Sequence, residues 1–318
     1  MKNDSWKTHF KERLKTVDEV NEYFSMNLPK DFPFDINIPL HLAKEIKDSD
    51  NQVLRSQFLP TKEEITSIQS RGQEDPIGDQ ENSKHQGIVH RYQNRILFFP
   101  TTNCPVICRY CFRKNELSDH EDYLKGRLGV LEKYLQENSA LNEVILSGGD
   151  PLMISNEKIE ETLHLIKKFK NIQYVRFHSR SPISMPRRID DKLIEILSSF
   201  VSDFKIIVVV HINHVSELSD ESIKAVQKLS PIKMLSQSVL LKGVNNDAFI
   251  LKDLFQKLDS LGISPYYLHH PDKVKGAMHF DLNIEEGLKI MKELRQLLPG
   301  WLIPRYIQDF SSGKVTLA

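Results

Sequence analysis

Three cysteines, Cys104, Cys108 and Cys111, lie within eight positions of one another, and the 318-residue sequence contains no others. Thiolates are soft ligands that suit iron–sulfur clusters or zinc, and these spacings let three sulfur atoms converge on one face of a [4Fe-4S] cluster. An odd number of adjacent cysteines does not fit a disulfide framework. The triplet therefore predicts three ligands to a cluster whose remaining iron is open to another molecule. A closed zinc site would need a fourth protein ligand, such as a histidine.

The elements that must position these cysteines follow from the pattern of apolar residues. From Arg95 onward, short segments rich in β-branched and aromatic residues alternate with amphipathic segments. The expected strands are residues 95–101, 143–148, 174–178, 205–212, 233–241 and 264–269. The expected helices are residues 156–169, 189–200, 219–230 and 247–262. Strands separated by single helices predict parallel β-α-β units, so we expect an α/β fold with six strands in a partial (β/α)6 barrel.

The cysteine triplet follows directly after the first expected strand. Loops at the carboxyl ends of parallel barrel strands carry the active sites of such folds, so the position of the triplet agrees with its composition. Residues 1–90 are more polar and interrupted, and residues 61–87 contain few apolar side chains. We therefore expect a loop-rich and helical N-terminal extension at 1–90, followed by a core at 91–318 that holds the chemistry.

The composition restricts the classes of partner. Lysine plus arginine and aspartate plus glutamate both number 43, and no long run of like charge is present, so nucleic acid is not an expected partner. The first residues lack the apolar segment of a secretory signal, and no later stretch has the roughly 18 apolar residues of a membrane span. We therefore expect a cytoplasmic protein with no membrane contact.

Beyond these observations, the sequence resembles a known superfamily. The CxxxCxxC spacing, with the aromatic Tyr110 before the last cysteine, resembles the cluster motif of radical S-adenosylmethionine (SAM) enzymes. From Val89 to Lys314 the chain is similar to the lysine 2,3-aminomutase family, and within it resembles the branch that makes (R)-β-lysine for modification of elongation factor P. The motifs that carry this resemblance are VHRYQNRILFFPTTNCPVICRYCFRK, ILSGGDPLM, HSRSPISMPRRI, HINH, SQSVLLKGVN and PYYLHHPDKVKGAMHF.

The resemblance implies a [4Fe-4S] cluster, SAM and pyridoxal 5′-phosphate (PLP) as cofactors, with the cluster bound by the cysteine triplet. A GGD loop alone is an ordinary strand-to-helix turn, but the resemblance implies that its small residues let the backbone approach the methionine moiety of SAM. The implied SAM contacts are Ser147, Gly148, Gly149, Asp150, Ser179, Arg180, His211 and Gln237.

The implied PLP lysine is Lys314, in a segment where the glycine run of the family is shortened to SSGK. Small neighbours let the flat cofactor approach, and burial or neighbouring cations make a lysine a better imine former. From the residues alone, a solvated lysine is the other interpretation. The resemblance further implies that Arg91 and Arg95 bind the PLP phosphate and that Tyr92 contacts the ring. Without the resemblance, both arginines would be interpreted as surface residues.

The resemblance also implies an amino acid substrate that is bound at both ends. Arg113 matches the position that binds the substrate carboxylate, and Asp272 and Asp309 match the pair that binds a terminal ammonium in lysine-specific enzymes. A distal carboxylate facing two aspartates would be repelled, so L-lysine is favoured over glutamate. Either aspartate alone could be a loop or cap residue.

The implied activity is that of an isomerase, a PLP-dependent radical SAM aminomutase that converts L-lysine to β-lysine. It needs an electron donor such as flavodoxin or ferredoxin, and a homo-oligomer is compatible with the sequence. Two alternatives stay open. One is another radical SAM reaction, such as that of glutamate 2,3-aminomutase, and the other is a non-catalytic iron–sulfur protein that uses the cysteines only as ligands.

Overall fold

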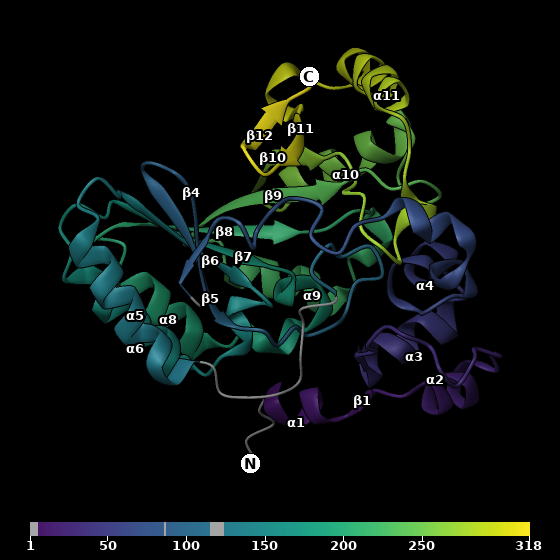
Figure 1. Ribbon diagram of the computed structural model, residues 1–318, viewed down its shortest axis with the longest axis horizontal. Helices are drawn as coiled ribbons and strands as arrows, with labels where there is room; N and C mark the ends of the chain where they lie inside the picture. The colour runs from purple at the N-terminus through teal and green to yellow at the C-terminus, as the bar shows by residue number, and fades with distance from the viewer. Residues whose placement is uncertain (1–5, 86, 115–123) are drawn as a thin grey trace.

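Ten strands form one sheet in the part of the chain that the computed structural model describes, residues 6–85, 87–114 and 124–318. The order β12-β11-β10-β9-β8-β7-β6-β5-β4-β3 places each strand beside its neighbours in the chain. The sheet curls into a half-barrel (Figure 1). Its strands are β3 (Ser83–His85), β4 (Ile88–Tyr92), β5 (Arg95–Thr101), β6 (Glu143–Gly148), β7 (Tyr174–Ser179), β8 (Lys205–His211), β9 (Lys233–Val239), β10 (Ile263–His269), β11 (Arg305–Phe310) and β12 (Gly313–Thr316).

The strands from β5 to β11 are all parallel, which confirms the expected α/β half-barrel. The six expected strands correspond to β5 through β10. The parallel strand β11 and the antiparallel β12 were not expected, because Arg305, Gln308 and Asp309 interrupt the apolar pattern of β11. Residues after β12 continue this pairing, since the backbone N–H of Tyr306 donates to the carbonyl of Ala318 at 2.9 Å.

Helices cover the outer face of the sheet because the parallel strands are apolar on that side. Val175 and Phe177 of β7 join the main core there, whereas Arg176 and His178 line a cavity on the inner face. The four expected helices are present, and α5, α7 and α11 are additional. The helices of this region are α5 (Leu124–Glu137), α6 (Asn156–Lys167), α7 (Ser181–Ser184), α8 (Asp191–Ser199), α9 (Asp220–Lys228), α10 (Ala248–Ser260) and α11 (Ile284–Leu297), with short 3-10 turns η3 (Pro151–Met153), η4 (Pro186–Arg188), η5 (Val215–Glu217), η6 (Met278–Phe280) and η7 (Gly300–Leu302).

The N-terminal segment has a separate apolar core, and Figure 1 shows its helices in purple and blue beside one end of the half-barrel. Val106 of the cysteine loop is part of this core, so the N-terminal helices pack directly on the loop. The elements are α1 (Trp6–Lys11), β1 (Arg13–Leu14), α2 (Val17–Phe24), β2 (Ile38–Pro39), α3 (Leu40–Ser49), α4 (Gln52–Phe58), η1 (Lys62–Ile65) and η2 (Ser67–Arg71).

The main sheet begins at Ser83, within the range expected for the N-terminal extension. The expected domain boundary near residue 90 stays a prediction. No helix among the described residues is long and apolar enough to cross a membrane.

Candidate active site

A cavity of about 550 Å³ lies on the concave face of the sheet and extends to the loops that follow its strands. All the residues that the sequence pointed to line this one cavity, although their individual roles stay predictions. They are Arg91, Tyr92, Arg95, Cys104, Cys108, Cys111, Arg113, Ser147, Gly148, Gly149, Asp150, Ser179, Arg180, His211, Gln237, Asp272, Asp309 and Lys314.

The three cysteines lie on the loop after β5 and are free thiols. Asn37 donates from Nδ2 to the carbonyl of Cys104 at 2.8 Å, and the N–H of Cys111 donates to the carbonyl of Cys108 at 3.0 Å. Burial raises the pKa of all three thiols, that of Cys111 to about 12. Bound iron would reverse this effect, because a coordinating thiol loses its proton.

The cysteine loop supplies three sulfur ligands from adjacent positions. Among the described residues, no three His, Cys, Asp or Glu side chains converge on a point that could hold one ion. A zinc ion would need sulfur ligands about 2.3 Å from its centre, whereas each cysteine of a cluster binds a different iron. Three cysteine sulfurs on one loop can each bind a different iron of a [4Fe-4S] cluster, which leaves the fourth iron open to another ligand.

A buried ionic triad anchors the cysteine loop to the N-terminal segment. Arg109 donates from Nη2 to Glu64 at 2.6 Å, and Lys114 donates to the same carboxylate oxygen at 3.1 Å. All three side chains are at most 1% exposed, and Lys114 also donates to the carbonyl of Gly276 at 2.7 Å. Removal of one partner from such a buried pair costs about 3–5 kcal/mol. Arg109 and Lys114 thus stabilise the conformation of the cysteine loop through their contacts with Glu64 of the N-terminal segment.

The glycines of the SGGD loop make close backbone contacts with the cysteine loop. Gly148 has φ +104, and a Cβ on Gly149 would lie only 2.3 Å from the carbonyl oxygen of Asn103. The N–H of Gly149 donates to the carbonyl of Thr101 at 3.0 Å. The absence of side chains at these positions lets β6 and the cysteine loop meet, while the expected approach to SAM stays a prediction.

Asp150 connects the ends of β6 and β7. Its carboxylate accepts hydrogen bonds from the hydroxyl of Ser179 at 2.8 Å and from the backbone N–H groups of Arg180 and Ser181 at 2.8 and 2.9 Å. It also accepts from the N–H of Leu152 at 2.9 Å. The side chains of Asp150 and Ser179 are therefore directed toward one another, and they position the loops around the cavity.

The expected SAM site has an aromatic wall and an available donor. The hydroxyl of Tyr110 lies 2.7 Å from Nε2 of His211, and the two rings are stacked with centroids 5.8 Å apart. Gln237 follows on the neighbouring strand β9. The buried Nε of Arg180 has no partner among the described residues. A buried donor without a protein partner can bind a ligand or an ordered water, so this wall is compatible with a polar cofactor such as SAM.

The expected PLP site lies where β12 returns beside β4. The backbone N–H of Lys314 donates to the hydroxyl of Tyr92 at 2.6 Å, and a Cβ on Gly313 would lie 2.9 Å from that hydroxyl. The guanidinium of Arg95 lies 3.6 Å from the centroid of the Tyr92 ring. Lys314 is thus held against the cavity, and the planar ring and arginines of this corner fit a phosphate-bearing aromatic cofactor.

The amine of Lys314 is paired with Asp309, and His269 and Asp272 lie close enough to this pair to interact with it electrostatically. Lys314 donates to both oxygens of Asp309, at 2.5 and 2.6 Å, and Nδ1 of His269 lies 3.0 Å from the same carboxylate. Burial alone would raise the pKa of Asp309, but His269 and Lys314 more than offset it and hold the pKa below its usual range. Burial and the adjacent Asp309 raise the pKa of Asp272 to about 7.

Asp79 is a member of the site that the sequence did not reveal. Its carboxylate accepts from Nη2 of Arg91 at 2.6 Å and from Nε of Arg113 at 2.9 Å. Asp79 is 5% exposed and joins the arginine expected to bind PLP with the arginine expected to bind substrate. It lies in a polar stretch without periodicity, and no local signal distinguishes it from the other acidic residues there.

The half-barrel, with a cysteine triplet on the loop after its first parallel strand, defines a radical SAM enzyme. A family model described as a 4Fe-4S single cluster domain matches residues 92–182. The L-lysine 2,3-aminomutase of Buchnera aphidicola is 34% identical over 96% of this chain and 92% of its own. That of Haemophilus influenzae is 34% identical over 94% of this chain and 88% of its own. The chain therefore belongs to the lysine 2,3-aminomutase family.

Membership of this family makes the protein an isomerase, a radical SAM aminomutase acting on a small amino acid, and implies a [4Fe-4S] cluster, SAM and PLP as cofactors. The family contains more than one specificity. The glutamate 2,3-aminomutase of Clostridioides difficile is 32% identical over 75% of this chain and 57% of its own. The charges in the cavity are therefore needed to choose between substrates.

Proposed function

We propose that this protein converts L-lysine to β-lysine. The observation that carries the proposal is the charge distribution of one cavity, where the cationic Arg113 and the two acids Asp272 and Asp309 line the same space as Lys314. An amino acid with a second ammonium group matches both ends of this arrangement. Glutamate would bring a second carboxylate toward two acids, which is unfavourable.

Each of these residues has a distinct role in the proposal. Arg113 binds the substrate carboxylate, and Asp309 and Asp272 bind the distal ammonium. Lys314 attaches PLP covalently through its amine, and Arg91 and Arg95 bind the phosphate. When bound, the cluster and SAM would supply the radical chemistry needed for removal of a substrate hydrogen atom, and PLP would supply the chemistry needed for migration of the amino group.

The protein side chains keep the two ends of the substrate fixed while this chemistry proceeds. Asp309 is paired with Lys314 in the free protein, so this carboxylate is available to a substrate ammonium once the Lys314 amine is engaged by PLP. His269 holds Asp309 on its other side at 3.0 Å and limits its movement. Accurate placement of this kind contributes most where a radical must reach one carbon and avoid its neighbours.

The sequence resemblance supports a further part of the proposal, which is that the product serves modification of elongation factor P. The radical SAM reaction also requires a one-electron donor such as flavodoxin or ferredoxin, and a homo-oligomer is compatible with the sequence. A cytoplasmic location agrees with three free thiols that bind a cluster, because reducing conditions keep thiols available.

The test is an anaerobic assay of the iron-reconstituted, PLP-loaded protein with SAM, dithionite and either L-lysine or L-glutamate. Mass spectrometry would follow 5′-deoxyadenosine and the β-amino acid. We expect β-lysine from L-lysine and no β-glutamate, and we expect β-lysine to disappear in Cys108→Ala and Lys314→Ala. β-Glutamate as the main product would overturn the substrate assignment.

A further inference from the structure

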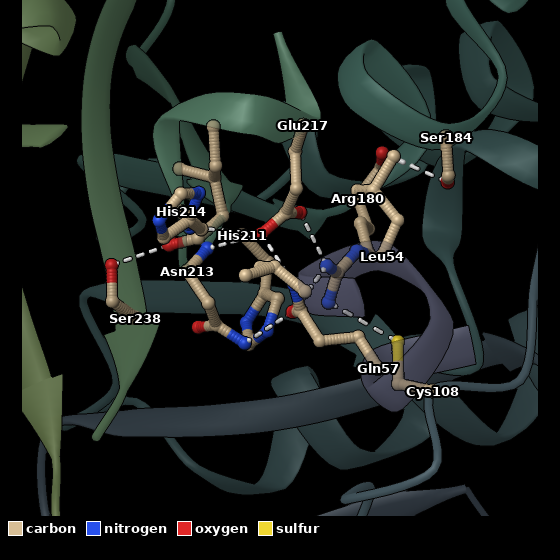
Figure 2. A network of polar contacts seen from close by, with 12 residues as sticks. Leu54, Gln57, Cys108, Arg180, Ser184, His211, Asn213, His214, Glu217 and Ser238 are labelled. Atoms are coloured by element: carbon tan, nitrogen blue, oxygen red, sulfur yellow. Dashed lines mark hydrogen bonds and ion pairs between the residues drawn. The ribbon is translucent and has the colours of Figure 1, made fainter. Parts of the chain in front are cut away.

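The terminal nitrogens of the Arg180 guanidinium contact the cysteine loop and two buried side chains. One of its nitrogens, Nη1, donates to the sulfur of Cys108 at 3.2 Å and also contacts the hydroxyl of Tyr110. The other, Nη2, donates to Gln57 Oε1 at 3.2 Å and forms an ion pair with Glu217. Figure 2 shows the guanidinium among the side chains of Glu217, Gln57 and Cys108. A buried cation therefore lies directly against a sulfur expected to bind the cluster.

Glu217 is buried and accepts several hydrogen bonds besides its ion pair with Arg180. Its side chain is 1% exposed. The carboxylate oxygen that does not face Arg180 accepts from the backbone N–H groups of Asn213 and His214, both at 2.9 Å, and from Gln57 Nε2 at 3.2 Å. The position of the carboxylate is thus set by the backbone after β8, and Arg180 is fixed through it.

Gln57 brings the N-terminal segment into the same network. Its side chain is fully buried, and its amide oxygen accepts from Asn213 at 3.0 Å as well as from Arg180. Its amide nitrogen donates to Glu217. The backbone carbonyl of Gln57 also accepts from the N–H of Arg109 in the cysteine loop at 2.8 Å. Helix α4 therefore contacts the loop and the Arg180–Glu217 pair through one residue.

We propose that Arg180, held by Glu217 and Gln57, tunes the reduction potential of the cluster. Hydrogen bonds to cluster sulfurs and nearby charge set this potential. Reduction by one electron from an external donor adds negative charge to the cluster. A guanidinium on the Cys108 sulfur stabilises that added charge and raises the potential, whereas the carboxylate of Glu217 moderates the effect. Gln57 acts as a positioning residue that lets the N-terminal segment contribute to electron acceptance.

The test is an anaerobic redox titration of reconstituted protein without SAM, in which electron paramagnetic resonance follows the reduced cluster. A tenfold change in a one-electron equilibrium corresponds to about 59 mV. We expect Arg180→Gln to lower the midpoint potential by about that amount, Glu217→Gln to raise it, and Gln57→Leu to lower it by less. The matched control is Arg187→Gln, which removes an arginine charge from an exposed ion pair and should leave the midpoint unchanged.

Iron and sulfide contents must match those of the unaltered protein for each variant. If Arg180→Gln does not take up a cluster, Arg180→Lys can be measured instead. Lysine retains the charge but not the planar fork, so we expect the midpoint potential to decrease by less than the amount expected for Arg180→Gln. The proposal would be overturned if Arg180→Gln and Glu217→Gln shifted the midpoint potential in the same direction, or if neither variant shifted it. An unaffected Gln57→Leu would remove the role of the N-terminal segment. The titration needs no substrate, so its result is independent of whether lysine is the substrate.

Discussion

The amine of Lys314 lies within 2.6 Å of both carboxylate oxygens of Asp309. The expected cofactor lysine is thus paired with an acid expected to bind the substrate. Attachment of PLP would withdraw this cation from Asp309, so cofactor loading and the capacity to bind a substrate ammonium are connected by one carboxylate.

Asp309→Asn should therefore separate cofactor binding from substrate binding. We expect PLP still to form its imine with Lys314, visible in the absorbance spectrum, because the amine itself is retained. Loss of the charge should weaken L-lysine binding by about 2–5 kcal/mol, or roughly 30- to 5,000-fold. Spectral titration of the PLP-loaded variant with L-lysine measures this, and a change below about threefold would contradict the assignment.

Substrate affinity should depend on pH through Asp272, whose pKa is raised to about 7 by burial and by the adjacent Asp309. Below this pKa the carboxyl group is protonated and neutral, so it no longer attracts an ammonium. Affinity for L-lysine should therefore rise with pH and level off above about 7, with a loss of about tenfold one pH unit below the pKa. Asp272→Asn should bind weakly with no such dependence, and the same profile in both proteins would argue against Asp272.

Asp79→Asn should destabilise the protein most when PLP is absent. Asp79 compensates the buried charges of Arg91 and Arg113, and removal of one partner from a buried network costs about 3–5 kcal/mol. The PLP phosphate should restore an anion beside Arg91 and recover part of this loss. Urea unfolding with and without PLP provides the comparison. Asp191→Asn, which changes an exposed ion pair, should alter stability by about 0.5 kcal/mol or less.

Gly149→Ala should displace the cysteine loop, because the new Cβ would lie 2.3 Å from a backbone oxygen. We expect a stability loss of about 1–3 kcal/mol and lower iron content after reconstitution. Gly129→Ala is the matched control, since a Cβ there meets nothing within 4 Å and alanine favours helix α5 by up to about 1 kcal/mol. Full cluster uptake by Gly149→Ala would show that the loop accommodates the methyl group.

The sequence predicted the strands from β5 to β10 well, because their outer faces are continuous apolar surfaces that pack beneath helices. β11 was missed because Asp309 and its polar neighbours interrupt the pattern of apolar residues that predicts a strand. Candidate site residues such as Arg113 and Lys314 came from extended family motifs, and the fold places them in one cavity. Asp79 and Gln57 could not be found in this way, since their importance arises from contacts with residues distant in the chain.

The contact between Tyr92 and the backbone of Lys314 gives the half-barrel a closure that its strand ladder lacks. β4 and β12 lie near opposite ends of the sheet order, and the Tyr92 hydroxyl, together with the hydrogen bond from Asn82 to the carbonyl of Ser311, joins these ends. A cofactor bound covalently at Lys314 and ionically at Arg91 and Arg95 would span the same seam. Cofactor binding would then stabilise the state in which the two ends of the sheet are joined. The free energy needed to separate these ends should therefore increase with the logarithm of cofactor concentration.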